Sequence, residues 1–533
     1  MVTRLVSVPL VALALLASAC STTQPSASDG ASSAPASVDQ PSPSNSAPEG
    51  LAFSDELSDT LRVSVPTMDF VAPHEVDETD PVQVLVTDLL TDGLTIRDPG
   101  SGIPLPGVAS SFRASTDGLT WTFFLGDSTF GDGSPILAAD VVASLNRVAD
   151  QGVTSISGSN LWPIVGWEAA SDGPVEGIVA LDDVTVQISL TEQFSSLAEV
   201  LAGVTFGIWP AEPNEATELP TSSAIDFTPT ALWENGIRLE GEERPGEVSA
   251  IELLVDPAHD LVETGDTDLG ISADPDAPLG DLRGVTVERS ADAFYAMNSL
   301  VAPFDDALIR QAIVHAVDRE ALRQEFFPNA GLMESFVPMS VLGGTANACG
   351  DACAFDVEQA TLLVEASPSR GIEFSVDFFA DEDDDTEQRL AEAVVSSLRA
   401  VGLLATARPH LPEDYGARAA NGELGMFRFG SVSTTLAAEA EIAALFHSAG
   451  RDNLTGTSIS RFDGLIQGAR AEANPVVRAS IYEGAEQLLF AEAVVLPLVE
   501  FRHSLVLGPS LASAGLEPDG SLDLSVIEFA ASE

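Results

Sequence analysis

The sequence predicts a globular α/β protein of two or three domains. Its 533 residues are too many for one small core, and 45% of them are hydrophobic, so the chain can bury a large apolar surface. Strand and helix patterns also follow one another closely, most clearly between Pro106 and Arg147. These observations are typical of packed layers of sheet and helix.

The segment 106–147 contains one strand pattern and one helix pattern, each preceded by a turn signal. Asp117 and Gly118 precede a strand whose apolar side alternates through Leu119, Trp121, Phe123 and Leu125. A second turn at residues 131–133 leads through Pro135 into a helix, and the apolar side of this helix is formed by Val141, Val142 and Leu145. The residues alone therefore predict strand, turn and helix in this order.

The chain is strongly acidic. It has 23 basic against 82 acidic residues, a formal net charge of -59, and it contains no lysine. A nucleic acid is not an expected partner, because phosphate binding needs a basic surface. The same charge disfavours docking on an anionic membrane through the protein surface. The lack of lysine excludes Schiff-base and Ser-Lys chemistry. Two alternative explanations of this acidic, lysine-free composition stay open: adaptation to high salt, and biased genome composition.

Sequence motifs for catalysis and metal binding are absent. There is no Gly-x-Ser-x-Gly, no His-Glu-x-x-His, no Gly-x-Gly-x-x-Gly after a strand and no phosphate-binding loop. The six histidines show no metal-ligand spacing and stand at positions 74, 259, 315, 410, 447 and 503. We therefore expect no enzyme, no cofactor and no metal ion.

The first 50 residues have the pattern of an export signal and a tether. Residues 1–20 combine Arg4, an apolar run that is too short to span a bilayer, and small residues before Cys20. The end of this segment resembles a bacterial lipobox, although Ala17 stands where a Leu is usual, so we expect lipidation at Cys20 rather than ordinary secretion. Residues 21–50 are almost all small or polar and predict a disordered tether.

Cys349 and Cys353 are the other two cysteines of the chain. With Cys20 assigned to a lipid, one pair is left for an oxidising compartment, and we expect a local disulfide. A metal site at Cys-x-x-x-Cys would need further ligands, and no histidine is close in sequence.

Further elements follow along the chain. Residues 61–66 and 372–379 predict strands, and an Asp-Asp turn within 177–190 predicts a hairpin. Asp305 or Asp306 can cap a helix with Leu308, Ala312 and Ala316 on one side. The acidic run 381–385 is interpreted as a helix start rather than a calcium loop, since Thr386 stands where such a loop needs a turn Gly.

The order of these motifs resembles the family-5 solute-binding proteins, the dipeptide- and oligopeptide-type receptors of ABC importers. The resemblance covers most of residues 61–505, and it is carried by the segment 106–147, the hairpin 177–190, Phe294–Asn298 and the helix 305–319. It weakens at 211–250, where the Gly-Thr-Gly-Pro-Tyr turn of the family is missing, and at 426–440.

The resemblance implies an α/β, two-lobe periplasmic-binding-protein fold (type II, large dipeptide-receptor subtype) with mixed sheets and a hinge. Lobe I would span 51–290 with an inserted subdomain at about 86–198, lobe II would span 291–490, and residues 491–533 would return to lobe I. The implied protein is a monomer, anchored by lipid to the outer face of the cell membrane, that delivers a small-molecule or peptide-like ligand to an ABC permease. The alternative is a receptor-like lipoprotein that regulates or scaffolds envelope assembly without transport.

The resemblance also suggests where a ligand would bind. Peptide-binding relatives hold the ligand amine with the Asp of a Gly-Trp-x-x-Asp segment, which corresponds here to Gly430–Thr434, with Ser431 in place of Trp and Thr434 in place of Asp. A neutral Thr cannot form the charge-assisted bond, so a sugar, a capped or cyclic compound or a lipid-linked group is favoured over a free peptide. Core packing is the alternative for Phe70, Tyr295 and Phe429. The expected ligand-binding residues are Tyr295, Asn298, Phe429, Ser431, Thr434, Asp69, Phe70 and Trp162.

Overall fold

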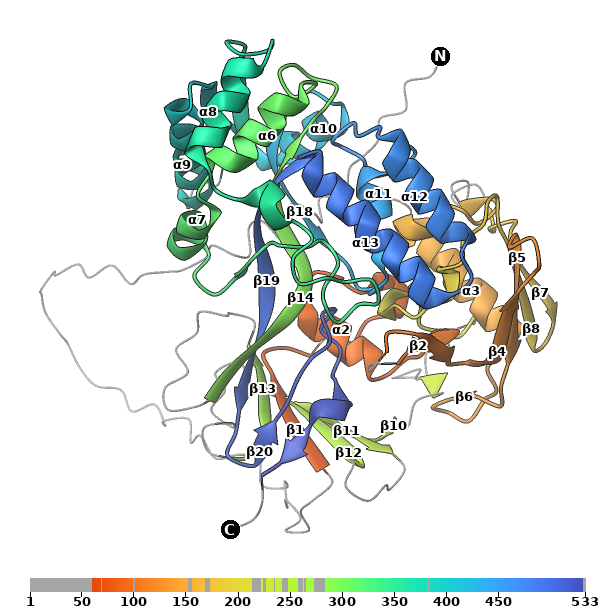
Figure 1. Ribbon diagram of the computed structural model, residues 1–533. Helices are drawn as coiled ribbons and strands as arrows, with labels where there is room; N and C mark the ends of the chain where they lie inside the picture. The colour runs from red at the N-terminus through yellow and green to blue at the C-terminus, as the bar shows by residue number, and fades with distance from the viewer. Residues whose placement is uncertain are drawn as a thin grey trace, which may run out of the picture.

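Two long antiparallel strands, β14 (Arg283–Met297) and β19 (Val495–Leu507), run through the middle of the molecule and join its two ends (Figure 1). The computed structural model describes residues 60–68, 70–98, 101–151, 156–167, 173–212, 222–223, 227–233, 235–241, 248–256, 262, 265–272, 283–380 and 384–530. The expected signal segment, the tether, Cys20 and Asp69 lie outside these residues. Within them, the main sheet has eleven strands in the order β10-β11-β12-β1-β13-β19-β14-β18-β16-β17, with β15 paired to β19.

One end of this sheet is formed by the first strand of the described chain and its neighbours. β1 (Thr60–Val65) lies parallel to β12 (Ala250–Val255) and β13 (Leu269–Ser272), and β13 lies antiparallel to β19. β10 (Phe227–Trp233) and β11 (Gly236–Gly241) complete this edge. Leu61, Val63 and Leu253 are fully buried, and α2 (Pro81–Asp88) packs on the same core. The strand predicted at 61–66 is confirmed.

The other end carries most of the helices (Figure 1). β16 (Glu373–Phe379) lies parallel to β17 (Leu404–His410) and to β18 (Met426–Val432), so the sheet is mixed. The helices here are α6 (Ala307–Ala316), α7 (Arg319–Phe326), α8 (Val357–Ala366), α9 (Thr386–Ala400) and α10 (Pro412–Ala420). Asp306 caps α6 by accepting from the Leu308 amide at 3.0 Å, as the sequence predicted.

A separate four-stranded sheet stands at the side of the molecule, in the order β4 (Ala109–Ala114), β5 (Thr120–Leu125), β8 (Thr185–Ser189) and β7 (Ile178–Asp182) (Figure 1). Trp121, Phe123 and Leu125 of β5 are buried against α3 (Ala138–Gln151), which confirms the predicted strand, turn and helix and the hairpin. Shorter elements nearby are β2 (Thr95–Arg97), β3 (Pro104–Pro106), β6 (Thr129–Phe130), β9 (Ser222–Ser223), the 3-10 helix η3 (Ser157–Leu161) and α4 (Leu197–Val200).

Three helices lie between this side sheet and the rest of the molecule. They are α11 (Ala438–Phe446), α12 (Ser460–Ala471) and α13 (Pro475–Ala491) (Figure 1). Ala437 and Ala440 are buried in the core of the side sheet, whereas Ile442 and Phe446 belong to the core around β14 and β18. α11 therefore connects two hydrophobic cores.

The described residues form three main hydrophobic cores, one at each end of β14 and β19 and one around β5 and α3. The lobe boundaries expected from the sequence stay a prediction. β14 begins at Arg283, well before the strand predicted at Phe294. None of the described helices has the length and apolar character that crossing a membrane requires.

Candidate ligand-binding site

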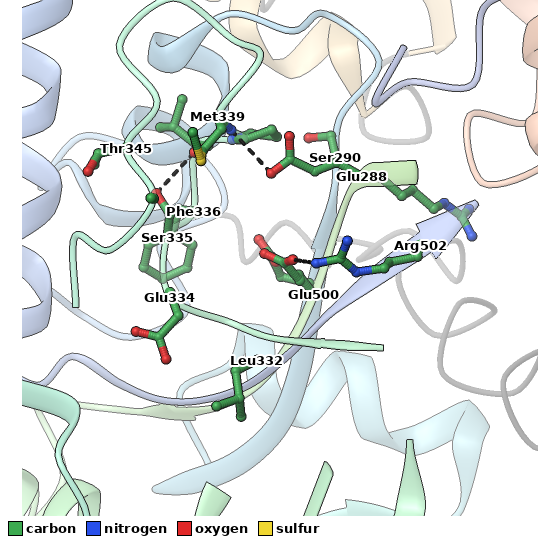
Figure 2. A pocket seen from close by; sticks show the side chains of 15 residues that line it. Glu288, Ser290, Leu332, Glu334, Ser335, Phe336, Met339, Thr345, Glu500 and Arg502 are labelled. Carbon is green, nitrogen blue, oxygen red and sulfur yellow. Dashed lines mark hydrogen bonds and ion pairs between the residues drawn. The ribbon is translucent and has the colours of Figure 1, made fainter. Parts of the chain in front are cut away.

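A cavity of about 530 Å³ lies beside the middle of β14 and β19. It is lined by residues 288–292 of β14, by Glu500 and Arg502 of β19, and by the segment from β15 (Gly331–Leu332) to Ala346 (Figure 2). Glu334, Ser335 and Phe336 approach from this segment, opposite Glu500 and Arg502. The volume is that of a typical small-molecule pocket, which measures about 300–1,000 Å³.

An irregularity in β14 shapes this cavity. Glu288 pairs with Arg502 and Asp292 pairs with Glu500, so three residues of β14, 289–291, lie opposite Phe501 alone. Ser290 bonds elsewhere: its amide donates to the Pro518 carbonyl at 2.7 Å, and its carbonyl accepts from the Ser433 amide at 2.9 Å. Such a bulge bends a strand and reorients its side chains, and here Glu288 and Asp292 both line the cavity.

Asp292 is the most unusual side chain of the cavity. The residue is only 8% exposed, and its strand neighbours are Glu500 of β19 and Ser431 of β18. Within the described part of the chain, its carboxylate has no hydrogen-bond or ion-pair partner. Burial raises the pKa of Asp292 well above its usual range, and the nearby carboxylates, of which Glu441 has the largest effect, raise this pKa further.

The neighbouring buried carboxylates do have partners. Glu441 accepts a hydrogen bond from the Ser290 hydroxyl at 2.9 Å, and burial raises the pKa of Glu441 to about 8. Glu486 accepts from the Val337 amide at 3.0 Å, from the Ser335 hydroxyl at 2.8 Å and from the Phe336 amide, and burial raises its pKa to about 7. These bonds satisfy one oxygen of Glu441 and one oxygen of Glu486, while the other oxygen of Glu486 is buried without a hydrogen-bond partner among the described residues.

The two arginines that line the cavity are already engaged. Arg502 pairs with Glu500 (Figure 2), and the Arg289 guanidinium donates to the Thr79 carbonyl at 2.7 Å. Burial lowers the pKa of Arg289 to about 10. Glu334 has its own partner, because the guanidinium of Arg319 lies 3.2 Å away. The cavity therefore presents an acidic surface in which Asp292 alone lacks a partner among the described residues.

Three of the residues predicted to bind ligand lie in or beside the core around β14 and β18. Tyr295 is fully buried, and its hydroxyl has no hydrogen-bond partner among the described residues. Asn298 shapes a turn, accepting from the Leu300 amide at 3.0 Å and donating to the Leu424 carbonyl at 3.3 Å. Phe429 meets Phe294 edge to face with ring centroids 5.7 Å apart. The packing of Tyr295 and Phe429 agrees with the core-packing alternative for these two residues, and the role of all three residues in ligand binding stays a prediction.

The other predicted residues lie apart. Ser431 is the strand partner of Asp292, and Thr434 is buried and donates its hydroxyl hydrogen to Glu78 at 2.8 Å. The Trp162 ring lies 4.7 Å from the Arg470 guanidinium, and Phe70 is 38% exposed. None of these side chains lines the cavity described above, so their role in binding stays a prediction.

Sequence reasoning missed Asp292, although a signal for it was present. Asp292 is the only charged residue in the run 291–297, which is otherwise apolar. A single acid inside a buried strand needs an explanation. The predicted strand began only at Phe294, so it did not include Asp292.

Two further predictions concern cysteine and metal. The Cα atoms of Cys349 and Cys353 are 5.6 Å apart, and their sulfur atoms lie within bonding distance. In the part of the chain that the structure describes, no group of three or more His, Cys, Asp or Glu side chains is arranged to hold a metal ion.

Comparison with known proteins identifies the family. The model of the bacterial extracellular solute-binding proteins, family 5 Middle, matches residues 104–228 and 256–453. Heme-binding protein A of Haemophilus influenzae is 24% identical over 449 residues, which covers 76% of this chain and 80% of that protein. Glutathione-binding protein GsiB of Shigella dysenteriae is 25% identical over 433 residues and covers 74% of this chain and 80% of its own length.

Solved structures show the same fold. The unliganded open form of the periplasmic murein tripeptide-binding protein MppA aligns with a TM-score of 0.71 at 19% identity, covering 89% of this chain and 97% of that chain. The fold is the α/β two-lobe type II periplasmic-binding-protein fold, and proteins of this family are extracytoplasmic binding proteins rather than enzymes. The chain belongs to the bacterial extracellular solute-binding proteins of family 5.

Proposed function

We propose that this protein captures a small solute or peptide-like molecule in the cavity between β14, β19 and residues 332–346, and delivers it to an ABC import permease. The observation that carries the proposal is the position of the cavity beside the two strands that join the ends of the molecule. The relatives are named for heme, glutathione and murein tripeptide, three different ligands, so no relative's ligand is transferred to this chain.

Binding beside these strands gives the ligand a direct effect on conformation. The strands continue from the core around β1 into the core around β16 and β18. A ligand that contacts both ends more favourably when they are close together shifts the population toward a closed form. A permease that recognises the closed form then receives only loaded protein.

The proposal includes a tether to the outer face of the cell membrane. A lipid on Cys20 would anchor the chain, and residues 21–50 would span about 30 Å as a flexible coil. A disulfide between Cys349 and Cys353 suits this oxidising location. The protein would act as a monomer.

The test uses the full chain purified from the membranes of its own host. We expect a small molecule to be released when the protein is denatured, and the same molecule to bind the emptied protein in calorimetry. A strain that lacks the gene should take up less of this molecule. If no small molecule is released and a membrane protein co-purifies instead, the import function is wrong and a role in envelope assembly replaces it.

A further inference from the structure

We propose that the cavity binds a cationic group of its ligand, a protonated amine or a guanidinium, and that the carboxylate of Asp292 holds this group. This inference rests on the proposed solute-binding function and adds the chemical class of the solute. It starts from one unexplained feature, a carboxylate that is buried beside a cavity without a partner of its own.

Asp292 is a largely buried residue that lines the cavity. Its exposed fraction is 8%, and in the described part of the chain no donor hydrogen-bonds or pairs with it. Nearly all buried polar groups in proteins have partners, and the exceptions point to strain, function or a missing ligand. Because Asp292 lines a cavity of about 530 Å³, a ligand group can supply the missing donor.

The surroundings of Asp292 select the charge of that ligand group. Glu288, Glu334 and Glu500 also line the cavity, whereas the lining arginines, Arg289 and Arg502, are bonded to Thr79 and Glu500. An anionic group would therefore meet more carboxylates than arginines in the described lining, which is unfavourable. A cation is attracted by the same arrangement.

One strand neighbour of Asp292 supplies a further acceptor. Glu500 of β19 lines the cavity and pairs directly with Asp292, and directly paired residues of neighbouring strands project on the same face of a sheet. An ammonium group has three donors, and a guanidinium presents a fork that matches a carboxylate, so each can bond Asp292 and one neighbour. Burial raises the pKa of Asp292, and the neighbouring carboxylates raise it further, so the same negative surroundings that favour a proton on Asp292 also attract a ligand cation.

The experiment compares matched probes that differ only in charge. Arginine is paired with citrulline, in which a neutral urea replaces the guanidinium, and trialanine is paired with N-acetyl-trialanine. Calorimetry on the emptied full chain measures each affinity for wild type, for Asp292→Asn and for the control Asp385→Asn. Asp385→Asn changes the net charge by the same amount. Asp385 forms an exposed ion pair with Arg389 and does not line the cavity.

We expect at least one cationic probe to bind more than tenfold more tightly than its neutral partner. Asp292→Asn should weaken this binding by more than tenfold, while Asp385→Asn stays within twofold of wild type. Equal binding of charged and neutral probes, or tight cation binding that survives Asp292→Asn, overturns the inference and leaves the solute-binding function in place.

If none of the probes binds, the inference is tested with the molecule that is released when protein purified from its own host is denatured. A released cation whose binding is lost in Asp292→Asn supports the inference, and a cation that Asp292→Asn still binds, or a neutral or anionic molecule, overturns the inference alone. Release of no molecule contradicts the proposed function, and the inference is then overturned with it. The thermal midpoint of Asp292→Asn checks folding, and we expect it to equal or exceed that of wild type because the variant removes a buried acid without a partner.

Discussion

Thr434 donates its hydroxyl hydrogen to the carboxylate of Glu78 across 2.8 Å, and this bond joins two segments that are 356 residues apart in sequence. Glu78 is buried and also accepts hydrogen bonds from the amide and hydroxyl of Ser157 in η3. One carboxylate therefore connects the segment before α2, the region of the side sheet and the segment after β18. Burial raises the pKa of Glu78, and these hydrogen bonds oppose the increase.

Replacing Thr434 with Val tests this bond. The variant keeps the shape of the side chain but removes one donor from the buried carboxylate, so we expect the free energy of unfolding to fall by about 1–2 kcal/mol. Urea unfolding measures this change. The control Thr286→Val alters an exposed threonine on β14 that makes no side-chain hydrogen bond among the described residues, and it should change stability by less than about 0.5 kcal/mol. Unchanged stability of Thr434→Val with weaker ligand binding would instead support the ligand contact predicted from the sequence.

Arg470 provides a second connection and a second prediction. Its guanidinium lies 2.6 Å from Glu439 and 2.6 Å from Glu192, over the ring of Trp162, and its side chain is 3% exposed. Arg470→Met leaves the Glu439 carboxylate buried without its cation, and we expect a loss of about 3–5 kcal/mol.

The double variant Arg470→Met/Glu439→Gln controls this prediction. It removes both charges, so much of the lost stability should return. Urea unfolding of wild type, Arg470→Met, Glu439→Gln and the double variant gives the coupling energy. A cost below about 1 kcal/mol for Arg470→Met would show that the pair does not hold α11 and α12 together.

The sequence predicted the fold where short-range periodicity determines structure. β1, β5, the β7–β8 hairpin and the Asp306 cap of α6 all follow from patterns within ten or so residues. Such patterns are local, so they can be recognised without knowing which segments meet. The ordered series of these elements was also enough to identify the family.

The cavity could not be predicted in the same way. It joins residues 288–292, 332–346 and 500–502, which meet only in the folded chain. Its shape also depends on the irregular pairing at residues 289–291, where Ser290 bonds to Pro518 and Ser433. Neither partner is visible from the local sequence of β14, and a prediction based on family motifs directed attention to 430–434 instead.

The buried acids near the cavity predict that stability falls as the pH rises above neutral. Burial raises the pKa of Glu441 to about 8, above the ordinary value of 4.5. Between these values the folded protein holds a proton that the unfolded chain has lost, so the stabilisation is complete below pH 4.5 and is lost as the pH rises through 8. Burial lowers the pKa of His503 to about 3, below the ordinary value of 6.5. His503 therefore makes stability rise with pH, but only below pH 6.5.

Measurement between pH 6.5 and 8.5 therefore isolates the carboxylates from His503. We expect Glu441 to contribute a loss of about 2 kcal/mol across this range. Glu441→Gln retains an acceptor for the Ser290 hydroxyl but does not titrate, so the unfolding free energy of this variant should vary less with pH. An equally steep pH dependence in wild type and variant would show that Glu441 is not the responsible group.

Gly430 gives the last prediction, since it sets the distance between β18 and the strand that carries Asp292. A Cβ atom at position 430 would lie 2.6 Å from the backbone carbonyl oxygen of Asp292, closer than real Cβ atoms approach. Gly430→Ala must therefore move β18 away from β14, and with it Ser431 from Asp292. We expect both lower stability and weaker binding of the cationic probes.

Gly468→Ala is the matched control for Gly430→Ala. Gly468 lies inside α12, and a Cβ atom there would have no neighbour within 4 Å. Alanine is the better helix former, so this control should raise the free energy of unfolding by about 0.5–1 kcal/mol and leave binding unchanged. If Gly430→Ala is as stable as wild type and binds the probes equally well, the close approach of the two strands does not position Asp292, and the cavity tolerates displacement of β18.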